Sequence, residues 1–322
     1  MLSYRFFITK ISVWFASKAL CQLIQSVTSE RSPQSRQKVV NAARASFDMV
    51  RFWLRKNPHA PLQARVKRHQ CWVSEYASEQ GMSNDQVVIL FHGGGFVVGG
   101  DASHGPFASD LAYTLGCRVY LVEYPLVPET QLKETIRVCS QVVDSIMDHD
   151  ENKHYALMGT SAGGCIASQV VVRAITKNNQ RPFALYLMGP VIQHCFNYDA
   201  KKYLDHCNSD ELLGKSYRFL ISNPENKARA VELLGGSQVT ELLELPDEVI
   251  KEFPPTHITY QQGEVLSGEI SAFSKRLREN QVSAVDNIVD NAFHSFNIYN
   301  YLPQTRRYIE EIRRHLMRAE AK

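Results

Sequence analysis

The start of the sequence lacks an uninterrupted apolar run of the length that a membrane-spanning helix needs. Residues 1–24 contain many aromatic and aliphatic side chains, but Arg5, Lys10 and Lys18 interrupt them. A spanning helix requires roughly 18 or more consecutive apolar residues. The lysines and the poor cleavage sequence Ala16-Ser17-Lys18 also argue against a secretory signal peptide. We therefore expect neither a spanning helix nor a signal peptide in this segment.

The sequence also lacks any Cys-x-x-Cys pair. Its seven cysteines are odd in number and scattered: Cys21, Cys71, Cys117, Cys139, Cys165, Cys195 and Cys207. This distribution argues against a disulfide framework and predicts a reducing compartment, the cytoplasm. His194, His206 and Cys207 have no close paired spacing, so we predict no metal site.

Acidic residues are scarce in the first 72 positions, which carry 13 lysines and arginines against only Glu30 and Asp48. The rest of the chain has 23 basic and 31 acidic residues. A helix over residues 1–28 with an apolar face and cationic edges could either pack across the mouth of the main domain or lie peripherally on an anionic membrane surface. No base-stacking or groove-entering motif accompanies the positive charge, so no nucleic-acid partner is predicted.

A second helix is expected after a polar connection at residues 29–37. Its apolar positions recur at three- and four-residue spacing, and it is predicted to stop at Asn57-Pro58. These apolar residues are Val39, Ala43, Phe47, Val50 and Leu54. We expect its basic residues, Arg44, Arg51, Arg55 and Lys56, to form a solvated face.

The composition, 44% hydrophobic and 21% charged over 322 residues, is that of a globular chain with a large core. Short apolar runs predict strands separated by helices, as in an α/β domain with an accessory element. The predicted strands are Cys71–Val73 at an edge, Val87–Phe91, Cys117–Glu123, Tyr155–Met158, Phe183–Met188, Pro254–Tyr260 and Ala284–Val289. Residues 191–253 are polar and irregular, with short helices predicted at 216–221, 228–234 and 241–245.

Ser161 lies in the pattern Gly-x-Ser-x-Gly, between Gly159 and Gly163. The predicted strand before it and the helical apolar spacing after it place the serine on a strand-to-helix turn. Small residues on both sides allow a sharp turn that exposes the hydroxyl at the sheet edge. Ser161 is therefore the predicted nucleophile.

Three consecutive glycines, Gly93 to Gly95, follow His92 directly after a predicted buried strand. Glycines at this place cost conformational entropy unless the backbone itself has a task. Without Cβ atoms, the amides of Gly94 and Gly95 can approach a substrate oxygen and donate to it as negative charge develops. With the Ala162 amide, they make three predicted donors of an oxyanion hole.

These motifs together resemble the hormone-sensitive-lipase-like group of α/β-hydrolases, which carry His-Gly-Gly-Gly ahead of Gly-Asp-Ser-Ala-Gly-Gly. Residues 124–129, Tyr-Pro-Leu-Val-Pro-Glu, are similar to that family's Tyr-Arg-Leu-Ala-Pro-Glu, and the resemblance spans about residues 70–316. Two positions differ from the family pattern: Thr160 replaces Asp and Pro125 replaces Arg.

The resemblance implies an α/β-hydrolase fold, a mostly parallel central sheet flanked by helices with a helical cap. We expect the catalytic core at residues 71–190 and 254–322. Residues 1–70 would form a basic helical segment that is part of the cap, and residues 191–253 would be the cap insertion over the acyl pocket. Relatives often pair through the last strand and helix, so a homodimer is an expectation of the same kind.

The resemblance also implies the partners of the serine. The family's acid falls at Glu264, where glutamate stands in place of aspartate, and Glu269 is the rival carboxylate. His294, on the loop after the last predicted strand, matches the family's His-x-Phe and is the predicted general base and acid. Asp290 shares the strand end with that loop and is too close in sequence to orient the histidine. The chain order Ser161, Glu264, His294 is the one expected of α/β-hydrolases.

These residues predict a serine hydrolase that cleaves small carboxylic esters with short to medium acyl chains through an acyl-enzyme, with neither metal nor organic cofactor. Three alternatives remain open. The chain could be a membrane-associated deacetylase of acetylated lipids or sterols, or an amide hydrolase. It could bind ligands without catalysis. Its basic front could also be an interaction surface for anionic lipids or proteins.

Overall fold

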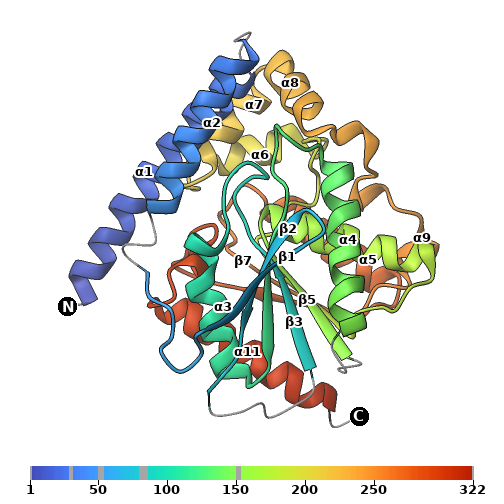
Figure 1. The fold of residues 1–322 in the computed structure, drawn as a ribbon. Helices are drawn as coiled ribbons and strands as arrows, with labels where there is room; N and C mark the ends of the chain where they lie inside the picture. Colours follow the sequence, from blue (N-terminus) through green and yellow to red (C-terminus); the bar gives the residue numbers. More distant parts are fainter. Residues whose placement is uncertain (1, 29–31, 50–53, 80–85, 150–153, 321–322) are drawn as a thin grey trace.

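A mostly parallel sheet of eight strands runs through the molecule (Figure 1). The computed structural model describes residues 2–28, 32–49, 54–79, 86–149 and 154–320. The strands are β1 (Leu62–Arg68), β2 (Cys71–Tyr76), β3 (Gln86–Phe91), β4 (Arg118–Glu123), β5 (His154–Thr160), β6 (Ala184–Met188), β7 (Thr256–Tyr260) and β8 (Ala284–Ile288). Their order is β1-β2-β4-β3-β5-β6-β7-β8, and β2 runs antiparallel to both β1 and β4, whereas all the other neighbouring pairs are parallel. The predicted mostly parallel sheet is confirmed.

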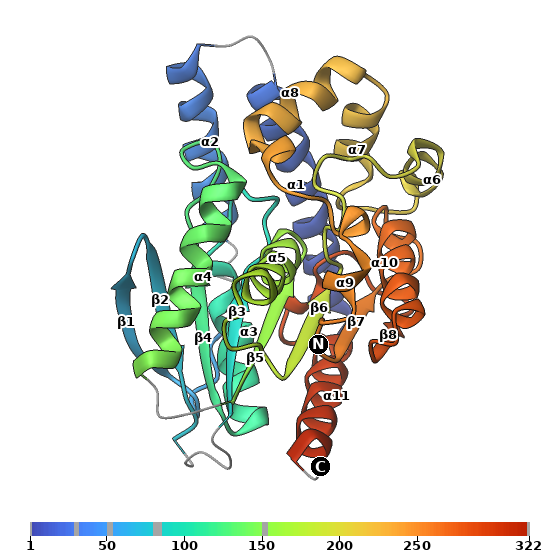
Figure 2. The same ribbon diagram turned by 90° about the vertical axis from the view of Figure 1, so that its right-hand side faces the viewer.

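Helices cover both faces of this sheet. Because successive side chains of a strand point to opposite faces, β3 sends Val88 and Leu90 into one apolar cluster and Val87 and Ile89 into the other. The first cluster contains α3 (Asp101–Leu115) and α11 (Pro303–Glu320). The second contains α4 (Leu132–His149), α5 (Ala162–Lys177) and α10 (Ser267–Glu279), as Figure 2 shows from the side. Two-sided burial explains why the central strands are continuous apolar runs.

The edge of the sheet differs from the prediction. Cys71–Val73 was expected to form an edge strand, but β2 is covered by β1, which was not predicted. Leu62, Ala64 and Val66 do alternate with polar residues. The signal is weak because Leu62 and Val66 are themselves exposed, at 38% and 43%, so neither face of β1 joins the core.

Two long helices precede the sheet and pack on each other, and the first of them lies beside the inserted helices (Figure 1). They are α1 (Leu2–Thr28) and α2 (Pro33–Asp48). The second begins earlier than predicted, inside the expected polar connection, because Ser32 accepts a hydrogen bond from the Ser35 amide and Pro33 occupies the first turn. The predicted positions Val50 and Arg51 lie outside the described residues. No helix among those described is both long and apolar enough to cross a membrane.

The insertion between β6 and β7 is helical. Its elements are α6 (Ala200–His206), α7 (Gly214–Ile221), α8 (Pro224–Leu234), η2 (Gly236–Gln238), η3 (Leu242–Glu244) and α9 (Asp247–Ile250). The α1 helix packs on α7 and α8, and Val13 and Leu23 of α1 are each 2% exposed. Arg229 of α8 also donates to the Thr28 carbonyl at 3.1 Å. These contacts favour packing of α1 on the domain, while membrane contact and a homodimer stay predictions.

Candidate active site

Ser161 occupies a strained turn between β5 and α5. Its φ of 52° and ψ of −118° lie outside the regions that side-chain-bearing residues ordinarily adopt. The turn requires glycine nearby, because a Cβ on Gly163 would lie 2.1 Å from the Phe91 carbonyl oxygen. Hydrogen bonds hold the turn in place, from the Ser161 amide to Met188 at 2.9 Å and from the Val191 amide to Ser161 at 3.1 Å. The hydroxyl is thereby fixed at the end of the strand.

The structure brings together the three side chains predicted as nucleophile, base and acid. His294 Nε2 lies 2.8 Å from Ser161 Oγ, and His294 Nδ1 lies 3.1 Å from Glu264 Oε2. A carboxylate only accepts hydrogen bonds, so Nδ1 carries the proton and Nε2 accepts from the serine hydroxyl. Glu264 lies after β7 and His294 lies after β8, so all three residues come from the carboxyl ends of parallel strands. This arrangement can transfer a proton from serine to histidine.

Burial shifts the pKa of His294 and the pKa of Glu264 each in one direction, and the contact between the two residues shifts each pKa in the opposite direction. All three side chains are buried, with Ser161 6% exposed, His294 3% and Glu264 2%. Burial alone would lower the pKa of His294, but the hydrogen bond and charge of Glu264, with the charge of Asp210, outweigh it and raise that pKa above its usual value. Burial raises the pKa of Glu264, and the contact with His294 partly offsets this. A protonated imidazole is thus stabilised where the proton is expected to arrive.

The rival carboxylate lies elsewhere. Glu269 is fully buried in α10, where Oε1 accepts from the Ile192 amide at 2.8 Å and the Gln193 amide at 3.3 Å. Its other oxygen accepts from the Tyr203 hydroxyl. Burial raises its pKa to about 8. Glu269 therefore joins α10 to the loop after β6 and to α6, while Glu264 contacts the histidine.

The glycine loop after β3 presents unused amides. The carbonyl of Gly94 accepts from the Val97 and Val98 amides at 3.1 and 3.0 Å, which closes a tight turn. The Gly93 amide donates to His104 Nε2 at 3.1 Å. In the described chain, by contrast, the amides of Gly94, Gly95 and Ala162 donate to no protein acceptor. Their free N–H groups are what an oxyanion hole requires.

The glycine loop offers a matched pair of variants. Gly94 has a φ of 127°, and a Cβ there would lie 2.0 Å from the Val98 carbonyl oxygen, whereas a Cβ on Gly95 would meet nothing within 4 Å. We expect Gly94→Ala to lower kcat by about a hundredfold or more, because the turn that aims the amides cannot close. Gly95→Ala should cost only about 1–2 kcal/mol of left-handed backbone strain. Ester hydrolysis and thermal unfolding of both variants measure this; equal losses would contradict the assigned geometry.

Arg44, on α2, reaches the same loop, a contact that the sequence did not predict. Its Nε donates to the Val97 carbonyl at 2.8 Å, and Nη2 donates to the Val127 carbonyl at 3.0 Å. Its guanidinium also forms a 2.6 Å ion pair with Glu129. The predicted solvated face is therefore wrong for Arg44, whereas Lys56 lies beyond the end of α2 and, still partly exposed, pairs with Asp101 at 2.7 Å. Basic charge on an amphipathic helix gave no sign of these partners, which are distant in sequence.

Thr160, one of the two departures from the family pattern, has a local partner. Asn297 Nδ2 donates to Thr160 Oγ1 at 2.9 Å, and both residues are buried. Asn297 belongs to the short helix η4 (Phe296–Ile298), which follows the His294 loop. This hydrogen bond ties the serine turn to the histidine loop.

One cluster of metal-ligating residue types occurs among the described side chains, formed by His194, Cys195 and Glu241. The Glu241 oxygens accept from the His194 amide at 2.9 Å and the Cys195 amide at 2.6 Å. Burial, reinforced by the Glu241 charge, raises the pKa of the Cys195 thiol to about 12, which disfavours the thiolate a metal would need. These contacts fit a structural role within the insertion. None of the three residues belongs to the predicted triad.

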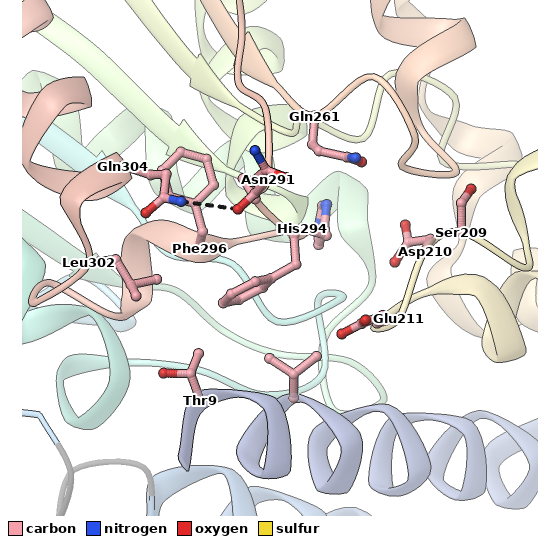
Figure 3. A pocket seen from close by; sticks show the side chains of 13 residues that line it. Thr9, Ser209, Asp210, Glu211, Gln261, Asn291, His294, Phe296, Leu302 and Gln304 are labelled. Carbon is pink, nitrogen blue, oxygen red and sulfur yellow. Dashed lines mark hydrogen bonds between the residues drawn. The ribbon is translucent and has the colours of Figure 1, made fainter. Parts of the chain in front are cut away.

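A cavity of about 240 Å³ lies beside His294, between α1, the insertion and the loops after β7 and β8 (Figure 3). Its lining residues are Thr9, Val13, Ser209, Asp210, Glu211, Gln261, Asn291, Ala292, Phe293, His294, Phe296, Leu302 and Gln304. Figure 3 shows Asp210 and Glu211 on one side of His294 and Thr9 of α1 at the opposite end of the lining, toward Leu302. Neither Ser161 nor the glycine loop is part of this lining. Of the predicted triad, the cavity therefore contacts the histidine and neither of the other two residues.

Comparison with known proteins agrees with this architecture. Residues 88–298 match the model of a family described as α/β hydrolase fold. A putative α/β hydrolase of Acanthamoeba polyphaga mimivirus is 25% identical over 221 residues, 67% of this chain and 62% of that protein. The chain thus spans less than two thirds of that relative's length. An esterase of Acinetobacter venetianus is 22% identical over 88% of this chain and 90% of its own.

The fold is also similar to solved structures. The crystal structure of an esterase from the bacterial hormone-sensitive lipase family aligns with a TM-score of 0.75 at 20% identity. The alignment covers 94% of this chain and 98% of that one. The likeness therefore extends beyond the sheet to the helices that precede it and those inserted into it.

Proposed function

Because the chain belongs to the α/β-hydrolase fold family, we propose that it is a serine esterase that cleaves small carboxylic esters. The observation that carries the proposal is the buried hydrogen-bonded series Ser161, His294, Glu264 beside three unused amides. Relatives named as esterases and lipases support the reaction class. The helices within the segments 1–70 and 191–253 are proposed to form the cap, which the contacts of α1 with α7 and α8 support, whereas β1 of the first segment belongs to the sheet.

In the first step, Ser161 Oγ attacks the ester carbonyl carbon while His294 Nε2 takes the hydroxyl proton. The oxyanion that forms accepts hydrogen bonds from the Gly94, Gly95 and Ala162 amides. The imidazolium is stabilised by Glu264. His294 then gives its proton to the leaving alkoxide, so an alcohol departs and an acyl-serine remains.

In the second step, His294 removes a proton from water, and the resulting oxygen attacks the acyl-serine carbon. The same amides stabilise the second oxyanion. When it collapses, the proton returns from His294 to Ser161 Oγ, and the carboxylic acid is released. Every proton moves through one side chain, and the mechanism needs no further group.

The position of His294 indicates where the alcohol lies. Because His294 must protonate the leaving oxygen, the alcohol portion of the ester has to be beside the imidazole, whereas the carbonyl oxygen faces the amides. The cavity is lined by His294 and its loop and excludes the glycine loop from its lining. We therefore place the alcohol in this cavity, with Val13 of α1 forming part of its wall.

This placement predicts that Val13→Ala changes selectivity for the alcohol and leaves selectivity for the acyl group unaltered. The larger cavity should raise kcat/KM for a bulky alcohol relative to a methyl ester by about tenfold. Leu23→Ala is the matched control, since Leu23 is equally buried on the same helix but does not line the cavity. An altered acyl preference in Val13→Ala would place the cavity on the other side of the ester.

The proposed function is tested with p-nitrophenyl esters from acetyl to palmitoyl. We expect hydrolysis with the highest kcat/KM for short to medium chains, because the triad is buried, with none of its side chains more than 6% exposed. Turnover confined to the longest chains would contradict the proposed chain range. Absence of turnover in the folded protein with every ester would contradict the esterase assignment.

A further inference from the structure

Asp210 of the insertion contacts the loop that carries the predicted acid. It is 7% exposed, and its Oδ2 accepts from the Val265 amide at 3.0 Å, one residue after Glu264. Its Oδ1 accepts from the Leu212 and Leu213 amides at 3.0 and 2.8 Å, just before α7. A single carboxylate thus bridges the insertion and the acid loop.

We propose that Asp210 is a positioning residue that couples the insertion to the triad, by holding the Glu264 loop through Val265 and by adding a second negative charge beside His294. The proposal rests on the esterase function and adds to it a group that no step of the mechanism uses. Ser209 supports the same junction, because its hydroxyl donates to the Gly263 carbonyl at 2.8 Å. The segment 263–265 is therefore held from the insertion on both sides of Glu264.

Few other charged side chains lie near His294. The charged and titratable groups nearby are Glu264 from its loop, Ser161 from the serine turn, and Asp210, Glu211 and Tyr217 from the insertion. Burial raises the pKa of Tyr217 well above its usual value, so it is neutral. Glu211 is exposed and hence screened by water. Asp210 and Glu264 are left as the two buried anions that favour the imidazolium.

The direction of the effect follows from this. His294 acts as a base only when neutral, and nearby negative charge raises its pKa, so activity on the acid side is lost at a higher pH than it otherwise would be. Removing the Asp210 charge should lower the His294 pKa and move the acid limb of kcat/KM to lower pH. Removing the Val265 acceptor should also loosen the Glu264 loop and lower kcat by about tenfold.

The test compares Asp210→Asn with Asp199→Asn in the full chain. Asp199 is also a carboxylate of the insertion that accepts backbone amides, from Lys201 and Lys202, but it caps α6 and makes no bond to the acid loop. Three quantities are measured: the imidazole pKa of His294 by NMR, the hydrogen exchange rate of the Val265 amide, and kcat/KM against pH. The first two need no turnover, so they remain informative even if the esterase assignment fails.

We expect Asp210→Asn to lower the His294 pKa and to speed Val265 exchange, and Asp199→Asn to change neither. Asp210→Glu keeps the charge and should restore the His294 pKa more fully than the Val265 protection; it also serves if the asparagine variant does not fold. Ser209→Ala removes a tether without removing charge and should leave the pKa unchanged. An unaltered His294 pKa in Asp210→Asn, or an equal shift in Asp199→Asn, would overturn the proposal.

Discussion

Replacing Ser161 with alanine is expected to abolish ester hydrolysis, with a loss in kcat on the order of a millionfold. The reason is that the hydroxyl is the atom proposed to form the covalent bond with the acyl group, and His294 Nε2 then has no oxygen to deprotonate. The loss is measured with a p-nitrophenyl ester of the best chain length for the wild type.

The fold should survive this substitution. The backbone strain at Ser161 is held by amide and carbonyl contacts that alanine retains. We expect the free energy of unfolding to change by less than about 1 kcal/mol. Thermal unfolding provides the control, and turnover at the wild-type rate in a folded Ser161→Ala protein would exclude this residue as the nucleophile.

Replacing Glu264 with glutamine is expected to lower kcat by about ten-thousandfold. Glutamine has nearly the same shape, but its amide can present a donor to His294 Nδ1, which favours the tautomer whose proton lies on Nε2. That tautomer cannot accept the Ser161 proton. The loss of the carboxylate also removes the anion that stabilises the imidazolium.

Glu269→Gln is the matched control for that prediction. Oε1 of Glu269 accepts both backbone amides, and Oε2 meets only the Tyr203 hydroxyl. A glutamine can keep all three contacts, because the tyrosine oxygen can accept from the new amide. We therefore expect activity within about threefold of the wild type and a change in unfolding free energy of about 1 kcal/mol or less. A larger kinetic loss in Glu269→Gln than in Glu264→Gln would reverse the assignment of the acid.

The central strands and the residues of the site could be predicted from the sequence for a physical reason. Strands buried on both faces are continuous apolar runs, and a parallel sheet brings the residues that follow them to one edge. Ser161 follows such a strand, while Glu264 and His294 follow the neighbouring parallel strands β7 and β8, of which β8 is a partly exposed edge strand. The structure places the three residues in hydrogen-bonding distance. Local patterns are enough when each functional residue lies at the carboxyl end of a parallel strand.

The features that the sequence did not predict depend on contacts between segments that are far apart along the chain. Strand β1 has two exposed faces, so its alternation carried no burial signal. Arg44 lies 85 positions from Glu129, and Asp210 lies 55 positions from Val265. Nothing in the composition of α2 or of the polar insertion distinguishes these two residues from solvated neighbours. Both contacts join segments outside the core, the N-terminal helices or the insertion, to the loops near the site. In these segments the spacing of apolar residues gives the least information about tertiary contacts.

These contacts give the helices outside the core a direct connection to the proposed chemistry. Arg44 holds the loop that presents the Gly94 and Gly95 amides, and Asp210 holds the loop that presents Glu264. The α1 helix forms part of the wall of the cavity at His294. We therefore expect changes in residues 1–48 to alter kinetics as well as stability.

The central claim, that Ser161 is a nucleophile activated by His294, is tested most directly by labelling with a fluorophosphonate probe and locating the adduct by mass spectrometry. The account predicts a single adduct on Ser161 in the wild type and a strongly reduced labelling rate in His294→Ala. A folded protein that acquires no adduct, or one labelled at another residue, would contradict the account.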